Sequence, residues 1–356
     1  MLHNQVTKVN RMRQLASIQK IVYVEPIHDA SAIELVHVLG WQCVIKKGEF
    51  APGQFAVYCE IDSFLPIRPE FEFLRKTSYK KNDVMGEGFR LKTIRLRGVL
   101  SQGLLLPLTL LPEGFEAVEG ADVTDLLGIK KYEEPESVGK NPQLQTIPAF
   151  ISKTDEVRIQ SEPALLQEFA GKPYYITTKL DGTSCTLGID SDGSVHACGH
   201  NFEFVQDDSC SFWKYARQFV EPMQAYRQKM GYATLYFQGE FCGQGIQKNR
   251  LKLVKPEWFV FTMSACGKRR DLFKLLSAKD EIGFSIVPIE ERGNDLLKKY
   301  PTLGALLARA EGEYSKGGQK EGIVIRPEAT YLSPILYGRP LSIKVINNKF
   351  LLKEKG

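Results

Sequence analysis

The first third of the chain alternates between apolar and polar residues over short stretches, as half-buried strands do. Residues 30–38 favour one short helix, and Pro52-Gly53 is a turn signal. The stretches with strand-like composition are residues 18–26, 43–47 and 55–61. Several short strands around one helix predict a small β-barrel within residues 14–110.

The pattern breaks between residues 130 and 147. The run from Lys130 to Glu136 is mostly charged, and Asn141-Pro142 and Pro148 interrupt any periodicity. We therefore predict a linker at residues 136–147. It would separate an N-terminal domain, residues 1–135, from a C-terminal domain, residues 148–356.

The second half mixes both periodicities. Residues 212–230 and 296–310 have apolar positions at helical spacing. Asp181-Gly182 and Asp192-Gly193 are typical hairpin turns, and predict a meander. The predicted strands are residues 174–178, 185–189, 195–198, 235–241, 258–263, 321–326 and 341–346. This arrangement predicts an α+β domain of mainly antiparallel sheets with helices.

Composition narrows the class of protein. The chain has 356 residues, a net charge of +5 and seven cysteines, none in a Cys-x-x-Cys pair. The mild positive charge permits an anionic partner, and the odd cysteine count argues against a disulfide framework. Residues 1–13 lack a secretory signal, and the apolar run at 103–112 is too short to span a bilayer. We expect a soluble intracellular monomer with no membrane partner.

Lys179 is the first candidate for chemistry, since it precedes Asp181 and Gly182 at the end of a predicted strand. A nucleophilic lysine needs surroundings that favour its free amine, and a glycine allows close approach to the backbone. By itself, Lys-x-Asp-Gly is better explained as a charged hairpin turn, because the motif is expected by chance in about one chain in ten of this length.

Three later segments carry further charged residues on predicted strands. Glu240 follows an apolar strand and a glycine, Glu321 begins the strand Glu-Gly-Ile-Val-Ile-Arg, and Lys344 lies inside the last strand. Each of these, taken separately, reads as an edge residue of a solvated strand. Their combination and order are what distinguish the chain.

In this order the segments resemble the motifs of the covalent nucleotidyltransferase superfamily, which comprises polynucleotide ligases and mRNA capping enzymes. Residues 148–160 look like the lead-in segment of RNA ligases. Residues 39–66 and 95–103 look like the OB domain of one RNA ligase group. The resemblance implies an N-terminal OB-type β-barrel followed by an ATP-grasp-like nucleotidyltransferase domain.

The resemblance also implies roles for individual residues. Lys179 would attack the α-phosphate of ATP and form lysyl-AMP. A hydrated Mg²⁺ or Mn²⁺ would be anchored by Asp181, Glu240 and Glu321. ATP and its phosphates would be bound by Arg158, Gly182, Asn201 and Lys344. The chain departs from the family pattern at two positions, since His200 stands where an arginine is usual and Ile346 where a second lysine is usual.

Two contacts have several candidates. Adenine stacks on aromatic rings, and Phe237, Phe259 and Phe261 are available, with core packing as the alternative role for each. A basic strand face suited to a nucleic-acid backbone is predicted from the alternation of Arg90, Lys92, Arg95 and Arg97, although a solvated face reads as well. The basic run at 248–255 extends the same groove in this interpretation, and Lys268-Arg269-Arg270 reads as a solvated turn.

The expected function is that of an ATP-dependent RNA ligase that seals 3′-OH and 5′-phosphate ends at nicks in duplexes. One alternative is a capping-type guanylyltransferase that uses GTP, which the short stretch after Lys344 argues against, because it leaves no room for a C-terminal OB domain. The other alternative is an RNA-binding module without catalytic activity. RNA ends are the expected partner in the first reading.

Overall fold

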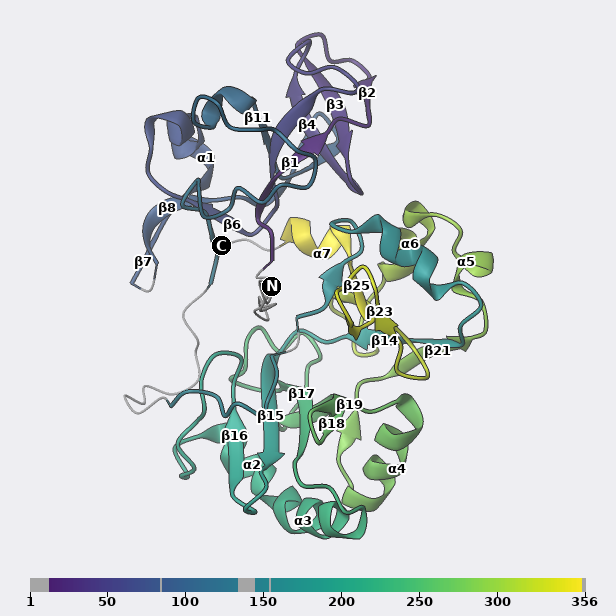
Figure 1. The fold of residues 1–356 in the computed structure, drawn as a ribbon. Coiled ribbons are helices and arrows are strands. Elements are labelled where there is room, and N and C mark those ends of the chain that lie inside the picture. The colour runs from purple at the N-terminus through teal and green to yellow at the C-terminus, as the bar shows by residue number, and fades with distance from the viewer. Residues whose placement is uncertain (1–12, 84, 134–144, 154, 354–356) are drawn as a thin grey trace, which may run out of the picture. The chain divides into compact units, whose positions relative to one another are not determined.

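The computed structural model describes residues 13–83, 85–133, 145–153 and 155–353, which fall into two compact units, Met1–Pro135 and Glu136–Gly356 (Figure 1). The first twelve residues of the polar N-terminal segment and most of the predicted linker at 136–147 lie outside the described residues. Each unit has a hydrophobic core of its own, so each is described separately.

The first unit is built from small antiparallel sheets. One has the order β1-β5-β11, with β1 at Ala16–Lys20, β5 at Phe55–Cys59 and β11 at Leu104–Leu106. A second has the order β2-β3-β4, with strands Tyr23–Pro26, Ile33–Val38 and Trp41–Lys46. A third has the order β12-β6-β8-β7, with strands Lys130–Lys131, Ser63–Leu65, Gly86–Arg90 and Tyr79–Asn82. The remaining elements are the hairpin of β9 (Thr93–Leu96) and β10 (Val99–Gln102), α1 (Arg75–Ser78) and the 3-10 helices Pro69–Leu74 and Leu108–Leu110.

The predicted helix at residues 30–38 is wrong, because most of this stretch is β3. The strand pairs antiparallel with β2 on one side and β4 on the other, and it buries Leu35, Val36 and Val38. Its β-branched residues suit a strand that is paired on both edges. Local composition predicted a helix because it carries no information about pairing with β2 and β4.

The predicted basic strand is also wrong. Arg90 ends β8 and is buried, with its guanidinium 4.1 Å from the ring centroid of Tyr132. Arg95 lies in the separate strand β9, and Arg97 lies in the following turn with φ of 46°. The turn and the break between β8 and β9 interrupt the alternation, so Arg90, Lys92, Arg95 and Arg97 do not share one strand face.

The second unit contains two larger sheets. The five-stranded sheet has the order β13-β25-β22-β14-β21, with strands Val157–Arg158, Ile343–Ile346, Gly322–Pro327, Tyr174–Lys179 and Ile289–Gly293. The six-stranded sheet has the order β16-β15-β17-β18-β19, with strands Val195–Cys198, Thr183–Ile189, Leu235–Cys242, Glu257–Ala265 and Lys268–Arg269. The short strand β20 (Ser285–Ile286) pairs with β18, and β23 (Leu332–Ser333) pairs with β24 (Arg339–Pro340).

Helices cover each sheet (Figure 1). The six-stranded sheet packs on α2 (Ser211–Ala216), α3 (Val220–Lys229) and α4 (Leu272–Ile282) around a core that includes Phe212 and Trp258. The five-stranded sheet packs on α5 (Leu296–Lys299), α6 (Leu303–Ala310) and the 3-10 helix Pro163–Phe169. The last helix, α7, is Asn348–Lys353.

Both predicted helices are interrupted. In the first, the 3-10 turn Arg217–Phe219 separates α2 from α3. In the second, Pro301 follows α5, and Thr302 caps α6 by accepting a hydrogen bond from the Ala305 N–H at 3.2 Å. A proline disfavours the helical conformation of the residue before it, which explains the second break.

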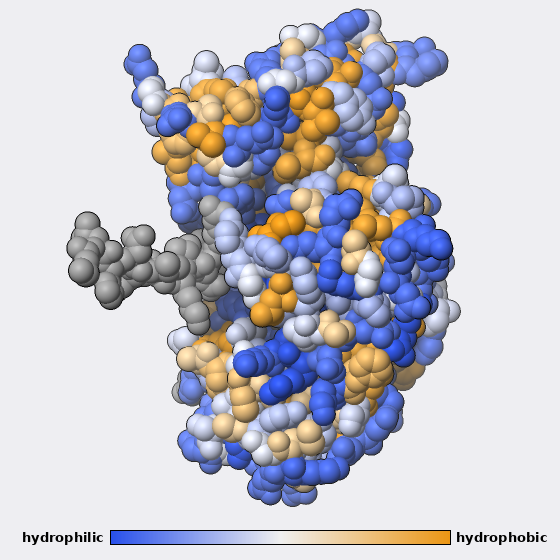
Figure 2. Space-filling view, turned by 45° about the vertical axis from the view of Figure 1, so that its right-hand side comes forward, coloured by the Kyte–Doolittle hydropathy of each residue, from blue (hydrophilic) through white to orange (hydrophobic). Residues whose placement is uncertain are grey.

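The cysteines are free thiols, six of them buried and one, Cys266, exposed. In the described part of the chain, no helix is long and apolar enough to cross a membrane. Figure 2 shows hydrophilic residues over most of the face that it draws, with smaller apolar patches between them.

Candidate active site where two sheets meet

The connection between β14 and β15 brings the predicted nucleophile to the place where the two sheets of the second unit join. β14 belongs to the five-stranded sheet and β15 to the six-stranded sheet. Asp181-Gly182 is therefore not a hairpin turn, as the sequence predicts, but the crossing from one sheet to the other. The turn at Asp192-Gly193 does join the paired strands β15 and β16.

Lys179 is the last residue of β14, and its amine lies against a carboxylate. Antiparallel pairing places Lys179 opposite Gly322, the first residue of β22. The preceding residue, Glu321, therefore reaches the lysine, and its Oε1 is 2.7 Å from the lysine Nζ. The side chains are 26% and 17% exposed, so the pair is partly withdrawn from solvent.

Glu240 meets the same connection from the other sheet. It lies on β17 opposite Ser184 of β15, and its Oε1 accepts a hydrogen bond from the Gly182 N–H at 3.1 Å. A Cβ at position 182 would lie 2.6 Å from Cys242 Sγ and from the Phe241 carbonyl oxygen. Gly182 is thus required by the close approach of β17, whereas the sequence suggested the approach of a ligand.

Burial and neighbouring charges shift the pKa values of Glu240 and Lys179. Burial raises the pKa of Glu240 to about 8; the charge of Lys179 opposes this shift and that of Glu321 adds to it. Burial works to lower the pKa of Lys179, but the charges of Glu321 and Glu240 and the hydrogen bond to Glu321 outweigh it and raise the pKa. The amine is therefore protonated in this structure and must lose a proton before it can attack.

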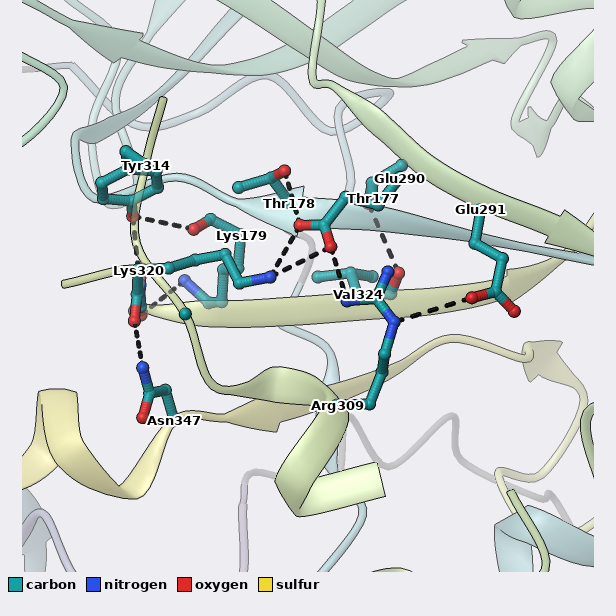
Figure 3. Close-up of polar contacts among 12 residues, drawn as sticks. Thr177, Thr178, Lys179, Glu290, Glu291, Arg309, Tyr314, Lys320, Val324 and Asn347 are labelled. Carbon is teal, nitrogen blue, oxygen red and sulfur yellow. Dashed lines mark hydrogen bonds and ion pairs between the residues drawn. The ribbon is translucent and has the colours of Figure 1, made fainter. Parts of the chain in front are cut away.

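Tyr314 joins the backbones on either side of the lysine–glutamate pair. Its hydroxyl donates to the Lys179 carbonyl oxygen at 2.9 Å and accepts from the Glu321 N–H at 3.2 Å (Figure 3). The ring is buried, 7% exposed. One hydroxyl group thereby sets the separation of the nucleophile and its carboxylate.

A second polar network holds the residue before Glu321 (Figure 3). Lys320 is buried and donates to both carboxylate oxygens of Glu290, at 2.9 and 3.0 Å. Glu290 also accepts from Thr178 and Arg309, both at 2.7 Å. The buried Asn347 donates to the Lys320 carbonyl oxygen at 2.8 Å. The strand residues on both sides of the site are thus fixed by side chains that do not enter it.

Two of the predicted phosphate-binding residues lie on neighbouring strands. Arg158 and Lys344 are paired in the parallel strands β13 and β25, and Lys344 Nζ lies 2.6 Å from Asp155. Asn201 accepts a hydrogen bond from Lys153 at 3.1 Å. Ile346 is buried in the core at the end of β25, so this departure from the family pattern turns an apolar side chain inward.

The three aromatic candidates separate into two groups. Phe237 is fully buried in the core of the six-stranded sheet, 4.8 Å from the ring centroid of Phe284, so the proposal that it stacks on adenine is wrong. The residues before and after Phe237 on β17 face the other side of the sheet, because successive side chains of a strand point to opposite faces. Phe259 and Phe261 are half-buried, beside the small cluster that contains Leu180 and Tyr314.

A buried ion cluster lies behind the site. Arg326 donates to Glu156, to the Phe261 carbonyl oxygen and, at 2.9 Å, to Ser342. Arg269 lies 3.5 Å from Glu156 and is 14% exposed. The predicted solvated turn at 268–270 is therefore wrong for Arg269, whose partner is 113 residues away. The cluster joins β22 of one sheet to β18 of the other.

Sequence reasoning missed several residues around the lysine. Tyr314, Glu290 and Lys320 lie outside the motifs, and nothing in their local sequence marks them. Arg250 was grouped with a basic run, but its Nε donates to Asp181 at 2.6 Å. Among the residues that the structure describes, no group of three or more His, Cys, Asp or Glu is arranged to hold a metal ion. Each of the three predicted metal anchors contacts a group of the protein instead: Glu321 contacts Lys179, Asp181 contacts Arg250, and Glu240 contacts the Gly182 N–H.

Comparisons with known proteins identify the fold and the family of the chain. A model of an OB-fold domain matches residues 15–108, and the RNA ligase family model matches residues 172–346. No curated protein matches the chain. Solved structures do match, among them Naegleria gruberi RNA ligase with PPi, at 33% identity over 96% of this chain and 98% of that one, with a TM-score of 0.84. A variant of the same ligase with ATP and Mn matches at 33% identity over 95% and 98%, with a TM-score of 0.82.

The fold and the site define a nucleotidyltransferase-type ligase with an N-terminal OB-fold domain, which confirms the predicted α+β class. Within that class, the chain belongs to the RNA ligase family.

Proposed function

We propose that this chain is an ATP-dependent RNA ligase that joins a 3′-OH end to a 5′-phosphate end at nicks in duplexes, with Lys179 as its nucleophile. The observation that carries the proposal is the lysine amine 2.7 Å from Glu321, at a crossing between two sheets that also brings in Asp181 and Glu240. The Naegleria gruberi ligase, whose structures include complexes with ATP and Mn and with AMP and Mn, supports the choice of nucleotide.

In the first step, the Lys179 amine attacks the α-phosphorus of ATP. A nitrogen–phosphorus bond forms, the bond to the β-phosphate oxygen breaks, and pyrophosphate leaves. Lys344 and Arg158, on adjacent strands, would hold the phosphates, and Phe259 and Phe261 remain the candidates for contact with adenine. Phosphoryl transfer depends mainly on such positioning and on charge stabilisation.

Asp181, Glu240 and Glu321 would hold a divalent cation through its water ligands. The raised pKa of Glu240 is consistent with this fit: burial is its main cause, the charge of Lys179 opposes it only in part, and the negative charges of Glu321 and Asp181 add to it. When bound, the cation neutralises charge on the α-phosphate and favours the free amine. Glu321 orients the lysine amine through their ion pair.

In the later steps, the AMP group passes from Lys179 to the 5′-phosphate of one RNA end. The 3′-OH of the other end then attacks that phosphate, AMP leaves, and a phosphodiester forms. In the OB-fold unit, residues 1–135, the exposed Arg95 and Arg97 of the β9–β10 hairpin are the proposed contacts with the RNA backbone.

The decisive experiment incubates the protein with α-labelled ATP or GTP and measures label bound to protein. ATP should label the wild type and a Lys172→Ala control, and Lys179→Ala should reduce labelling to background. Labelling from GTP alone would favour a capping-type activity. Labelling that survives in Lys179→Ala would contradict the assigned nucleophile.

Sealing of nicked duplexes then tests the substrate. Strands that carry RNA on the 3′-OH side should be sealed faster than strands that carry DNA there. Equal sealing of both would contradict the assignment to RNA repair, while leaving the nucleotide chemistry intact.

A further inference from the structure

Arg250 lies in the loop between β17 and β18 and binds one of the proposed anchoring carboxylates. Its Nε donates to Asp181 Oδ2 at 2.6 Å, and the two side chains are 15% and 21% exposed. Asp181 is two residues from Lys179. A charge-assisted hydrogen bond of this length limits the rotation of the carboxylate, and a carboxylate has acceptor positions left for other partners.

Phe350 holds the other side of the arginine. The Arg250 guanidinium carbon is 4.6 Å from the Phe350 ring centroid, a cation–π distance. Phe350 is buried in α7, three residues after Asn347. The Asn347 N–H donates to the Glu321 carbonyl oxygen at 2.9 Å. The start of α7 is thus tied to Glu321, and its phenylalanine is tied through Arg250 to Asp181.

The backbone around Arg250 is constrained in a way that fits this role. Gln247, Asn249 and Lys252 have φ values of 45°, 40° and 53°, in the left-handed region that non-glycine residues rarely adopt. The Asn249 side chain donates to the Leu253 carbonyl oxygen at 2.9 Å and accepts from its N–H at 3.0 Å, which closes the loop. Clustered unfavourable conformations of this kind persist where surrounding contacts determine them, often at functional sites.

We propose that Arg250 is a positioning residue for formation of lysyl-AMP, and that Phe350 of α7 acts through it to orient Asp181. The inference rests on the proposed function, and assigns the last helix a part in the active site. Lysine replaces the charge of Arg250 but not its planar guanidinium, so it should not take over the ring contact and the carboxylate contact together.

The experiment measures single-turnover labelling of the full-length chain by ATP, over a range of ATP concentrations at saturating Mg²⁺. Arg250→Ala should lower the maximal rate by about 10- to 100-fold and change the half-saturating ATP concentration by less than about threefold, because misplaced groups slow the chemical step. Arg250→Lys should recover a minor part of the rate, and Phe350→Leu should lower it by about three- to tenfold. Arg217→Ala, which removes an exposed arginine–aspartate pair remote from the motifs, is the matched control.

The double variant decides between positioning and simple packing. If Phe350 acts through Arg250, Phe350→Leu should have no further effect on the rate in the Arg250→Ala background. The inference would be overturned if the effects of the two substitutions on the rate were independent and multiplied. It would also be overturned by a wild-type rate in Arg250→Lys or in Phe350→Leu. These two conservative variants test the inference even if Arg250→Ala does not fold. A wild type that forms no lysyl-AMP would instead contradict the proposed function.

Discussion

Two carboxylates of the second unit, Glu240 and Glu156, are both withdrawn from solvent but have opposite surroundings. Burial raises the pKa of Glu240 to about 8, with Lys179 opposing the shift and Glu321 adding to it. Burial also works to raise the pKa of Glu156, but the charges of Arg326 and Arg269 outweigh it and lower the pKa to about 2. Two arginines neutralise Glu156, whereas Lys179 only partly opposes the effect of burial on Glu240. This difference separates a structural ion cluster from a site suited to a cationic ligand.

Glu156→Gln should have the largest effect on stability, because it leaves the buried Arg326 and the largely buried Arg269 without their anion. Breaking a buried ion pair costs about 3–5 kcal/mol, and the midpoint of thermal unfolding should fall by about 10 °C. Asp208→Asn, which breaks the exposed pair with Arg217 at 2.8 Å, should change the midpoint by no more than about 1 °C. Equal shifts in the two variants would show that Glu156 does not stabilise the fold by neutralising Arg326 and Arg269.

The rate of lysyl-AMP formation should rise with pH between about 6 and 8. The pKa of Lys179 is raised, and the attacking species is the free amine. As long as the pH is below that pKa, each rise of one pH unit therefore increases the fraction of free amine by up to about tenfold. The measurement is single-turnover labelling at saturating ATP and Mg²⁺. A profile that is flat over this range would show that proton loss from Lys179 does not limit the step.

Glu240→Gln should slow lysyl-AMP formation but stabilise the fold at high pH. Because the folded-state pKa is raised, the protonated form contributes stability that is present below the unfolded-state pKa and lost as pH rises through about 8. Glutamine does not titrate, and its Oε1 can still accept from the Gly182 N–H. At pH 9 the variant should therefore be more stable than the wild type by at least about 1 kcal/mol, and at pH 4 nearly equal to it. Thermal unfolding at both pH values checks the sign.

Tyr314→Phe should have a smaller effect on both properties. The change removes the hydroxyl that joins Lys179 to Glu321 and leaves the ring in place. The loss should destabilise the fold by about 1 kcal/mol and slow labelling by about five- to tenfold, with little change in half-saturating ATP. Tyr337→Phe, at a tyrosine that is 77% exposed, is the control. A labelling rate equal to that of the wild type would show that this bridge does not position the lysine.

The secondary structure around the motif residues could be predicted, because these residues lie on or beside strands that the apolar pattern marks. Lys179, Glu240, Glu321 and Lys344 lie on the predicted strands or at their ends. Local pattern does not specify strand partners, so it could not distinguish a hairpin at Asp181-Gly182 from a crossing between sheets. For the same reason the helix predicted at 30–38 proved to be β3, whose two neighbouring strands decide its conformation.

The residues that sequence reasoning missed have partners far away along the chain. Arg269 meets Glu156 across 113 positions, and Arg250 meets Asp181 across 69. An arginine with such a partner has the same local sequence as one on a solvated turn. Phe237 was assigned to the site but lies in the core. Aromatic residues on neighbouring strands cannot be told apart from local sequence, because the strand register decides which face of the sheet each one occupies.

The distribution of the thiols allows one site on the folded chain to be labelled selectively. Six cysteines are buried, including Cys242 beside Gly182, while Cys266 is exposed in the turn between β18 and β19. Burial raises the pKa of Cys242, so this thiol should not react with a maleimide, whereas hydrogen bonds from the Thr234 and Ala233 backbone lower the pKa of Cys266. One fluorescent dye per folded chain is expected, and Cys266→Ser should abolish its attachment. A dye placed there would label the folded chain without a chemical change at Lys179.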